Sequence, residues 1–165
     1  SCSEYKNQSH LTSTFFVKAK KKIKQYLKNN NISLVWLKLF FVYGKGQRKN
    51  SLIPFIVSSI KNKKNIVLKK PNMICDFIHV NDVCKFLLNH LNKKKENIEY
   101  DIGSGYGLKV KEILNFFNNI NNINNINNVN SFKLKKYKKC FKANMFYKKL
   151  KTKMKIENNL KSMIY

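Results

Sequence analysis

Apolar positions recur at helical spacing early in the chain. Over 15–28 they fall about one turn apart with lysines between them, which predicts an amphipathic helix that ends at the asparagine run 29–31. The next segment, 32–43, is almost continuously apolar and rich in β-branched and aromatic residues. Such a run is typical of a central strand covered on both faces. The sequence GKGQ at 44–47 ends it.

The rest of the chain alternates between short strands and helices. The patterns predict helices over 51–60, 83–91, 110–117 and 157–164, and strands over 65–68, 73–80, 98–102 and 132–137. Pro54 falls in the first turn of its helix, where proline is tolerated, and Asn81 or Asp82 is expected to cap the helix over 83–91. Residues 118–130 repeat Asn-Asn-Ile and read as an asparagine-rich, low-complexity loop insertion without packed structure. This alternation predicts an α/β fold.

Charge is the strongest compositional bias. The 165 residues hold 34 Lys and Arg against 8 Asp and Glu, a formal net charge of +26. Arg48 is the one arginine, although phosphate and base recognition favour the bidentate arginine fork. The lysines are also dispersed over every segment, which favours solvated surfaces over a dedicated nucleic-acid site. Weak, non-specific binding of polyanions at low salt is still expected.

The four cysteines are Cys2, Cys75, Cys84 and Cys140. Their spacings match no zinc pattern, so no metal site is predicted, and free, mostly buried thiols are expected. No apolar run is long enough to cross a bilayer, and residues 1–5 do not resemble a signal peptide. A cytoplasmic protein without membrane insertion is the expectation. The first residue is not methionine, so the natural start is expected to lie elsewhere.

Four separated segments carry a resemblance: LKLFFVYGKGQ at 37–47, SLIP at 51–54, DFIHVND at 76–82 and YDIGSG at 100–105. In this order and spacing they resemble the extended short-chain dehydrogenase/reductase superfamily, the NAD-dependent epimerases and dehydratases of nucleotide sugars. The resemblance implies a partial Rossmann-like parallel sheet, its C-terminal half, with a small substrate-binding lobe. The resemblance also implies that residues 1–165 form one partial domain of this family.

The resemblance also implies catalytic positions. Ser1 stands where the family has its catalytic Ser or Thr, and 16–20 (FVKAK) resembles the family's YxxxK motif. Lys20 is kept, but Phe16 occupies the usual tyrosine position and has no ionisable proton for acid/base work. Core packing on the amphipathic helix is the structural interpretation of Phe16. NAD or NADP would be contacted by Lys20, Phe40, Phe41 and Val42.

The implied partner is a nucleotide-diphosphate sugar. Its site would be formed by Tyr43, Gln47, Arg48, Leu52, Ile53, Pro54 and Cys75. Cys75 replaces the arginine that pairs with the pyrophosphate in the family, which removes a bidentate contact. No GxxGxxG motif occurs in the sequence, and GSGYG at 103–107 reads as a strand-end turn rather than a phosphate loop.

Three functional interpretations remain open from the sequence. The first is a truncated or inactive epimerase-, dehydratase- or reductase-like protein that lacks the N-terminal dinucleotide-binding half and has little or no activity alone. The second is one part of an enzyme completed by a separate N-terminal half or a homodimer. The third is a basic binding or scaffold protein for nucleic acid or anionic surfaces. His79 is interpreted as a hydrogen-bonded core histidine, on the opposite face of its strand from Asp76.

Overall fold

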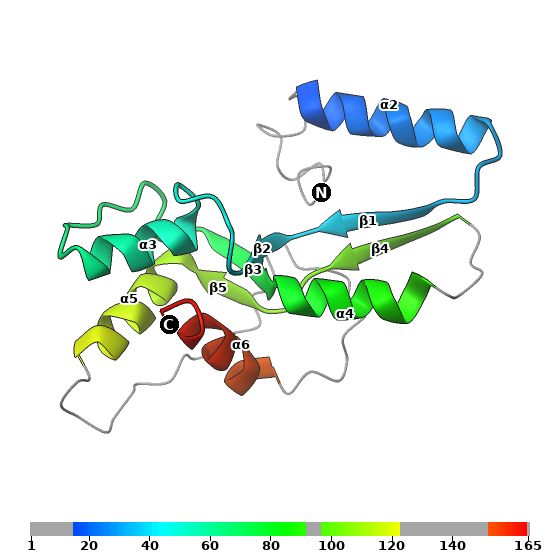
Figure 1. Cartoon of the computed structure of the whole chain (residues 1–165). Helices are drawn as coiled ribbons and strands as arrows, with labels where there is room; N and C mark the ends of the chain where they lie inside the picture. The colour runs from blue at the N-terminus through cyan, green and yellow to red at the C-terminus, as the bar shows by residue number, and fades with distance from the viewer. Residues whose placement is uncertain (1–14, 92–96, 123–151, 165) are drawn as a thin grey trace.

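The computed structural model describes residues 15–91, 97–122 and 152–164. Its elements form two neighbouring groups along one elongated body (Figure 1). The first group contains α2 (Phe15–Asn29), β1 (Val35–Leu39), α4 (Val80–Leu91) and β4 (Ile98–Ile102). The second contains β2 (Phe41–Tyr43), α3 (Leu52–Lys61), β3 (Ile74–His79), β5 (Gly107–Lys109), α5 (Val110–Asn122) and α6 (Thr152–Lys161).

Two small sheets follow one another along the chain. β1 pairs in parallel with β4, from Val35 opposite Ile98 to Leu39 opposite Ile102. β2 pairs in parallel with β3, and β3 pairs in antiparallel fashion with β5. The predicted α/β class with parallel strands is confirmed, whereas the antiparallel β5 was not anticipated from the sequence.

The prediction of a single strand over 32–43 that is covered on both faces is wrong in two respects. It divides at Phe40, whose amide donates to the carbonyl of Ile102 and whose carbonyl accepts from the amide of Val42, each at 3.0 Å. The chain thereby passes from one sheet to the other. β1 is also not covered on both faces, because all five of its residues are half-buried or exposed.

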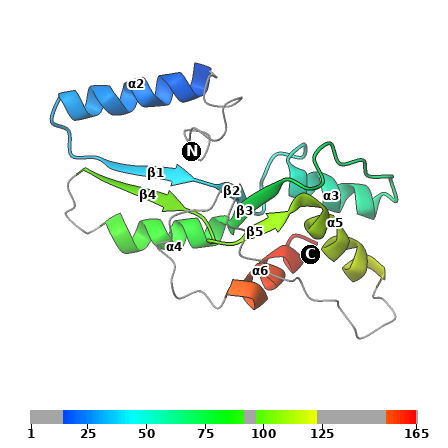
Figure 2. The same ribbon diagram turned by 180° about the vertical axis from the view of Figure 1, so that it is seen from behind.

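Each group of elements has its own apolar core. The larger core joins β2, β3 and β5 to α3, α5 and α6 through residues such as Tyr43, Ile56, Phe77 and Ile113. The smaller core lies between the β1–β4 sheet and α4, where Phe86 packs edge-on against Tyr100 with ring centroids 5.3 Å apart. Figure 2 shows α2 and α4 on opposite sides of this sheet.

Several expected boundaries need correction. Residues 65–68 are not a strand. α4 begins directly after β3 at Val80, so Asp82 lies inside its first turn and is not its cap. Instead, the His79 ring caps the helix, because its Nδ1 accepts from the Asn81 amide at 3.2 Å. The interpretation of His79 as a hydrogen-bonded core residue is confirmed, with 8% of its surface exposed.

The asparagine tract is partly helical. α5 continues through Asn122, and Ile120 packs against the larger core, so the expectation of an unpacked loop from residue 118 is wrong for 118–122. The start of α5 is fixed by Glu112, whose Oε2 accepts from the Lys109 amide at 2.7 Å. The remainder of the tract and the strand expected over 132–137 lie outside the described residues.

Phe16 does not pack in a core. It is 74% exposed on α2, while its neighbour Val17 is only 2% exposed. The apolar face predicted for this helix therefore exists, but it points away from the sheet. Within the described residues, no helix combines the length and apolar character that crossing a bilayer requires.

Candidate functional site

The turn after β2 is built on two glycines. A Cβ on Gly44 would overlap Cγ1 of Val80, so glycine is favoured where β2 passes the start of α4. Gly46 has a φ of +82°, which glycine adopts without strain. The amide of Gln47 donates to the Gly44 carbonyl at 3.3 Å and closes the turn.

This turn presents the Gln47 side chain to a cavity. Gln47 Nε2 donates to the Val42 carbonyl at 3.1 Å, which fixes the amide group. Its Oε1 is buried and has no hydrogen-bond partner. An unsatisfied buried acceptor is unfavourable in a folded protein, and a ligand with a suitably placed donor would relieve it.

α3 forms a second wall. Ser51 is its N-cap in an extended conformation, and the Phe55 amide donates to the Ser51 carbonyl at 2.9 Å. Pro54 lies in the first turn of the helix, as the sequence predicts, and its missing amide hydrogen is not needed there. Ile53 and Ile56 are buried and hold the helix on the larger core.

A cavity of about 710 Å³ lies between α3, the segment 67–73 and strands β2 and β3. Its walls are mostly apolar, and Phe41 and Phe77 contribute rings whose centroids are 5.6 Å apart. Lys69 and Lys70 add two cations to the lining. Apolar walls with a few polar groups are typical of small-molecule sites.

The structure brings together many of the residues singled out in the sequence. Phe41, Val42, Tyr43, Gln47, Leu52, Ile53 and Cys75 all line this cavity. Pro54 instead lines a neighbouring cavity of about 420 Å³ that also borders Gln47. Phe40 is buried beside the sheet junction, Arg48 is exposed, Lys20 lies on α2, and Ser1 is outside the described residues.

Sequence reasoning missed more than half of the lining. The unanticipated residues are Asn50, Ser51, Phe55, Val67, Leu68, Lys69, Lys70, Met73, Phe77 and Val110. Asn50 directly precedes the SLIP motif and Ser51 is its first residue, so both could have been included among the site residues. The pattern of 65–68 predicts a strand and indicates no binding role, and only the fold brings 67–70 opposite α3.

Tyr43 is buried against the cavity wall with 2% of its surface exposed. Its ring contacts His79 edge-on, with centroids 5.2 Å apart. Burial raises the pKa of the Tyr43 hydroxyl well above its ordinary value, and the negative charge of Asp82 raises it further. Tyr43 is therefore a neutral side chain at physiological pH and does not serve as a base.

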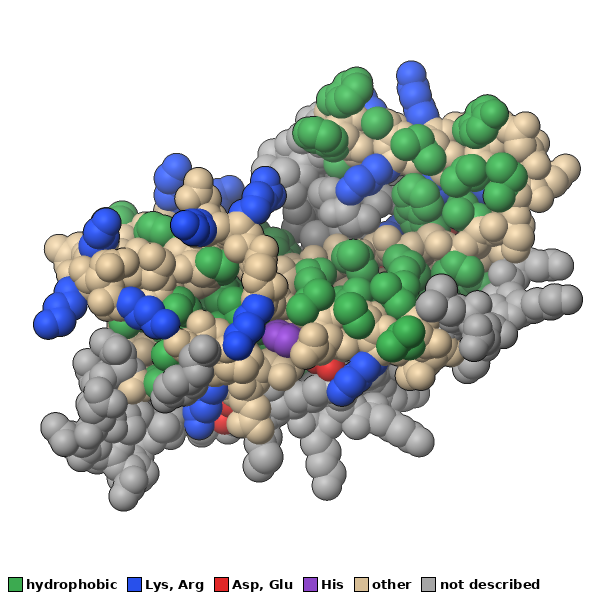
Figure 3. Space-filling view, in the orientation of Figure 1, with side chains coloured by type: hydrophobic (Ala, Val, Ile, Leu, Met, Phe, Trp, Pro, Cys, Tyr) green, Lys and Arg blue, Asp and Glu red, His purple; other side chains and the backbone are tan. Residues whose placement is uncertain are grey.

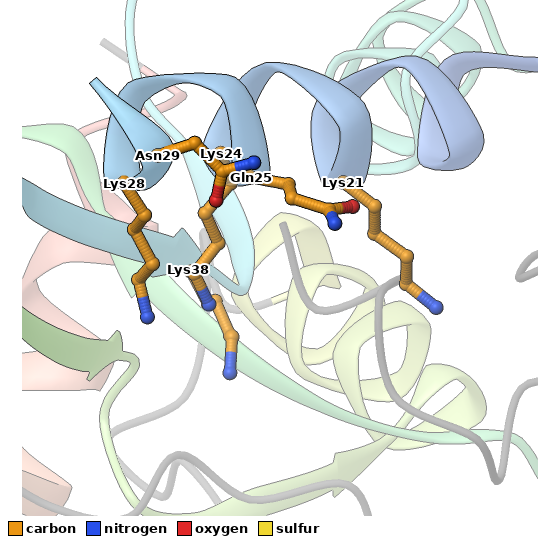
Figure 4. A pocket seen from close by; sticks show the side chains of 6 residues that line it. All are labelled: Lys21, Lys24, Gln25, Lys28, Asn29 and Lys38. Carbon is orange, nitrogen blue, oxygen red and sulfur yellow. The ribbon is translucent and has the colours of Figure 1, made fainter.

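A second cluster of polar side chains joins α2 to the small sheet. Lys21, Lys24, Lys28 and Lys38 line a shallow cavity of about 330 Å³ together with Gln25 and Asn29 (Figure 4). Glu99 on β4 pairs with Lys24, with Lys38 at 3.0 Å and with Lys28 at 3.7 Å. The hydrogen bond from Lys24, followed by the contributions of Lys38, lowers the pKa of Glu99 to about 2.

The GSGYG turn does not fit the pyrophosphate of a dinucleotide. The amides of Ser104 and Gly105 donate to the Asp76 carboxylate at 2.6 and 2.8 Å, so they are not directed at a ligand. Phosphate loops need such amides free to bind the anion. The described residues also hold no cluster of three or more metal-ligating side chains.

The parallel pairing of β1 with β4 and of β2 with β3 agrees with the parallel strands that the resemblance implies. The sequence model of the NAD dependent epimerase/dehydratase family matches residues 17–103, more than half of the chain. The chain belongs to this family.

Relatives in the family act on nucleotide sugars, as their names state. CDP-abequose synthase of Salmonella typhimurium strain LT2 is 35% identical over 98 residues, which are 57% of this chain and 33% of that protein. The UDP-glucose 4-epimerase of Thermotoga maritima, solved with UDP-glucose, superposes with a TM-score of 0.63 at 18% identity. It covers 89% of this chain, which in turn covers 50% of that enzyme.

A third comparison includes the cofactor. WbmG of Bordetella bronchiseptica, solved with NAD and UDP, superposes with a TM-score of 0.57 at 17% identity. The superposition covers 65% of this chain and 34% of the WbmG chain. The chain thus spans about a third of the curated relative and up to half of these solved structures. The structural likenesses establish the Rossmann-type α/β fold.

Proposed function

We propose that this chain forms the nucleotide-sugar side of an epimerase/dehydratase-type site and binds the nucleotide diphosphate in the 710 Å³ cavity. The observation that carries the proposal is the cavity itself, which gathers seven of the substrate and cofactor positions implied by the motifs. Its volume suits a nucleotide rather than a single ion or water cluster.

The lining offers matching chemistry for each part of such a ligand. Phe41 and Phe77 provide flat apolar surface for a nucleobase. Gln47 Oε1 provides an acceptor for an N–H or hydroxyl group. Lys69 and Lys70 provide point charges for the diphosphate, in place of the arginine that Cys75 replaces in the family pattern.

Nucleotide binding by the full 165-residue chain can be measured by titration calorimetry with UDP, CDP, GDP and dTDP. We expect measurable binding of at least one diphosphate and roughly thirtyfold weaker binding for the Lys69→Met/Lys70→Met double variant, because each of the two charge contacts contributes about 1 kcal/mol. Lys85→Met/Lys111→Met is the matched control, since both lysines are exposed and lie outside the cavity. Equal losses in the two double variants would contradict the proposal.

Catalysis by the chain alone is proposed to be weak or absent. A bound nicotinamide would supply hydride transfer, but Phe16 cannot move a proton at the tyrosine position, and the GSGYG amides are occupied by Asp76. Dinucleotide binding by this chain alone, as NAD or NADP, is accordingly expected to be weak. An assay with NAD, NADP and several nucleotide sugars tests this, and clear turnover would refute it.

A further inference from the structure

A second cavity lies beside α3 and has a volume of about 420 Å³. The helical residues that line it are Pro54, Val57, Ser58 and Lys61. They are three or four positions apart and therefore share one side of the helix. Phe55, on a different side of α3, lines the 710 Å³ cavity instead. The helix thus presents different sides to two cavities.

Two other parts of the chain complete the smaller cavity. The turn after β2 forms one wall with residues 44–47, and Met163 contributes from the C-terminal side of α6. Lys61 Nζ donates to the Ile164 carbonyl at 2.7 Å, which fastens the residues after α6 to the end of α3. Met163 also packs against the larger core. The cavity is therefore built by tertiary contacts among residues of this chain.

The charge at this cavity is positive. Lys45 lines it from the turn and Lys61 from α3, and none of the described residues that line it is acidic. Lys61 uses one ammonium hydrogen for the Ile164 carbonyl, so two remain for a ligand. Such a site favours an anion, and lysine is a common phosphate ligand.

The surrounding surface strengthens this preference. Residues 45–64 contain no Asp or Glu and six cationic residues, namely Lys45, Arg48, Lys49, Lys61, Lys63 and Lys64. Lys and Arg side chains gather over the part of the molecule that contains α3 (Figure 3). Their combined field raises the local concentration of small anions around the cavity.

The same cavity offers hydrogen-bonding groups for hydroxyls. Asn62 Nδ2 donates to the Ser58 carbonyl at 2.8 Å, which orients the amide group and leaves its Oδ1 as an acceptor. The Ser58 hydroxyl accepts a longer bond from the same nitrogen at 3.4 Å and keeps its own hydrogen to donate. Pro54, Val57 and Met163 add aliphatic surface. This combination suits a ring that carries hydroxyl groups.

We propose that the 420 Å³ cavity binds a sugar phosphate. Lys45 and Lys61 bind the phosphate, Ser58 and Asn62 bind the sugar hydroxyls, and the aliphatic side chains contact the ring carbons. The only residue shared with the 710 Å³ cavity is Gln47, so the two ligands occupy separate sites. The inference does not rest on the proposed nucleotide function.

The lining disfavours two other occupants. No aromatic side chain is among the described residues that line this cavity, whereas the 710 Å³ cavity contains the Phe41–Phe77 pair, so a nucleobase finds no stacking partner here. Inorganic phosphate would contact the lysines but would leave the hydroxyl-binding groups and the aliphatic surface unused. A sugar phosphate uses all three kinds of group.

Titration calorimetry of the full 165-residue chain at fixed ionic strength tests the proposal, with glucose 6-phosphate as the probe. We expect it to bind at least tenfold more tightly than glucose or inorganic phosphate, because each of these lacks one half of the contacts. Saturating UDP should change the affinity by less than about twofold, since the two cavities are separate. Lys69→Met/Lys70→Met should also leave it unchanged, which distinguishes this site from the nucleotide site.

Three variants locate the site. Lys45→Met should weaken glucose 6-phosphate binding roughly fivefold through the loss of one charge contact. Ser58→Trp should weaken it at least tenfold, because the indole would fill the cavity. Both positions are exposed, so we expect wild-type circular dichroism from these variants. Lys63→Met/Lys64→Met is the matched control, since it removes two nearby exposed lysines that do not line the cavity, and it should change binding by less than about twofold.

Four outcomes would overturn the proposal. One is the absence of glucose 6-phosphate binding, and another is equal weakening by Lys45→Met and the control, which would indicate a diffuse charge effect. Inorganic phosphate that binds as tightly as glucose 6-phosphate would reduce the site to a simple anion site. Competition between glucose 6-phosphate and UDP would place both ligands in the 710 Å³ cavity.

Discussion

Asp76 Oδ1 accepts two hydrogen bonds from Ser104, one from its amide and one from its hydroxyl, both at 2.6 Å. The two residues are 28 positions apart, and Asp76 is fully buried. The second carboxylate oxygen accepts from the Gly105 amide at 2.8 Å. This single side chain therefore fastens the turn after β4 to β3 and connects the two sheets.

Asp76→Asn should destabilise the fold strongly. The amide that replaces one carboxylate oxygen would face an N–H donor, so the expected loss is about 2–4 kcal/mol in the free energy of unfolding. Ser104→Ala removes the hydroxyl bond alone and should cost only about 1 kcal/mol. Urea denaturation measures the loss in the free energy of unfolding for each variant, and we expect the m-values to be unchanged. Equal losses in the two variants would argue against a carboxylate shared among three donors.

Acid should release α2 from the sheet. Pairing with Lys24 and Lys38 lowers the pKa of Glu99 to about 2 from the ordinary 4.5. A depressed carboxyl pKa gives stability that is present above the unfolded value and is lost as pH falls from about 4.5 towards about 2. Glu99 is partly exposed, so solvent screening limits each pair to less than about 1 kcal/mol.

The fluorescence of Trp36 reports this release, because Lys24 lies over its ring. We expect a change in emission across that acid range in the wild-type chain. Glu99→Gln should show the acid-state emission already at neutral pH and no transition between the two values. A transition of the same size in the variant would mean that other groups hold the helix.

Gly44→Ala should lower the free energy of unfolding through its contact with Val80. The new methyl group would meet Val80, and forcing such overlap costs about 1–3 kcal/mol. Val80→Ala removes the obstructing atom, so the double variant should be more stable than the sum of the single changes predicts. Gly46→Ala provides the contrast, since its strain comes from a φ of +82° with no atom nearby, and Val80→Ala should not relieve it. Thermal unfolding of the wild-type chain, the three single variants and the two double variants with Val80→Ala checks this cycle.

His79→Phe should weaken the start of α4 while keeping the ring beside Tyr43. The lost cap to the Asn81 amide corresponds to about 1 kcal/mol. His79→Asn retains a capping acceptor and should recover part of that loss. Amide hydrogen exchange of the first turn of α4 measures the effect directly. Identical exchange in both variants would show that the ring, rather than its nitrogen, supports the helix.

The residues that line the 710 Å³ cavity show how much of this site the sequence predicts. The motif 37–47 and the SLIP segment identify one wall because the turn glycines and the helix start are local features. Segment 67–73 completes the opposite wall. The sequence pattern wrongly predicted a strand over 65–68, because the segment has no regular secondary structure and its position depends on the packing of β3 and α3.

The sequence by itself determined the α/β class, the strands that carry DFIHV and YDIGSG, and the family, because these depend on local hydrophobic patterns and short motifs. The tertiary structure decided what Asp76, His79 and Phe16 do. Asp76 fastens a distant turn, His79 caps the following helix, and Phe16 faces solvent. Hydrophobic spacing establishes that α2 has an apolar face, but the ion pairs of Glu99 with lysines from two elements decide which way that face points.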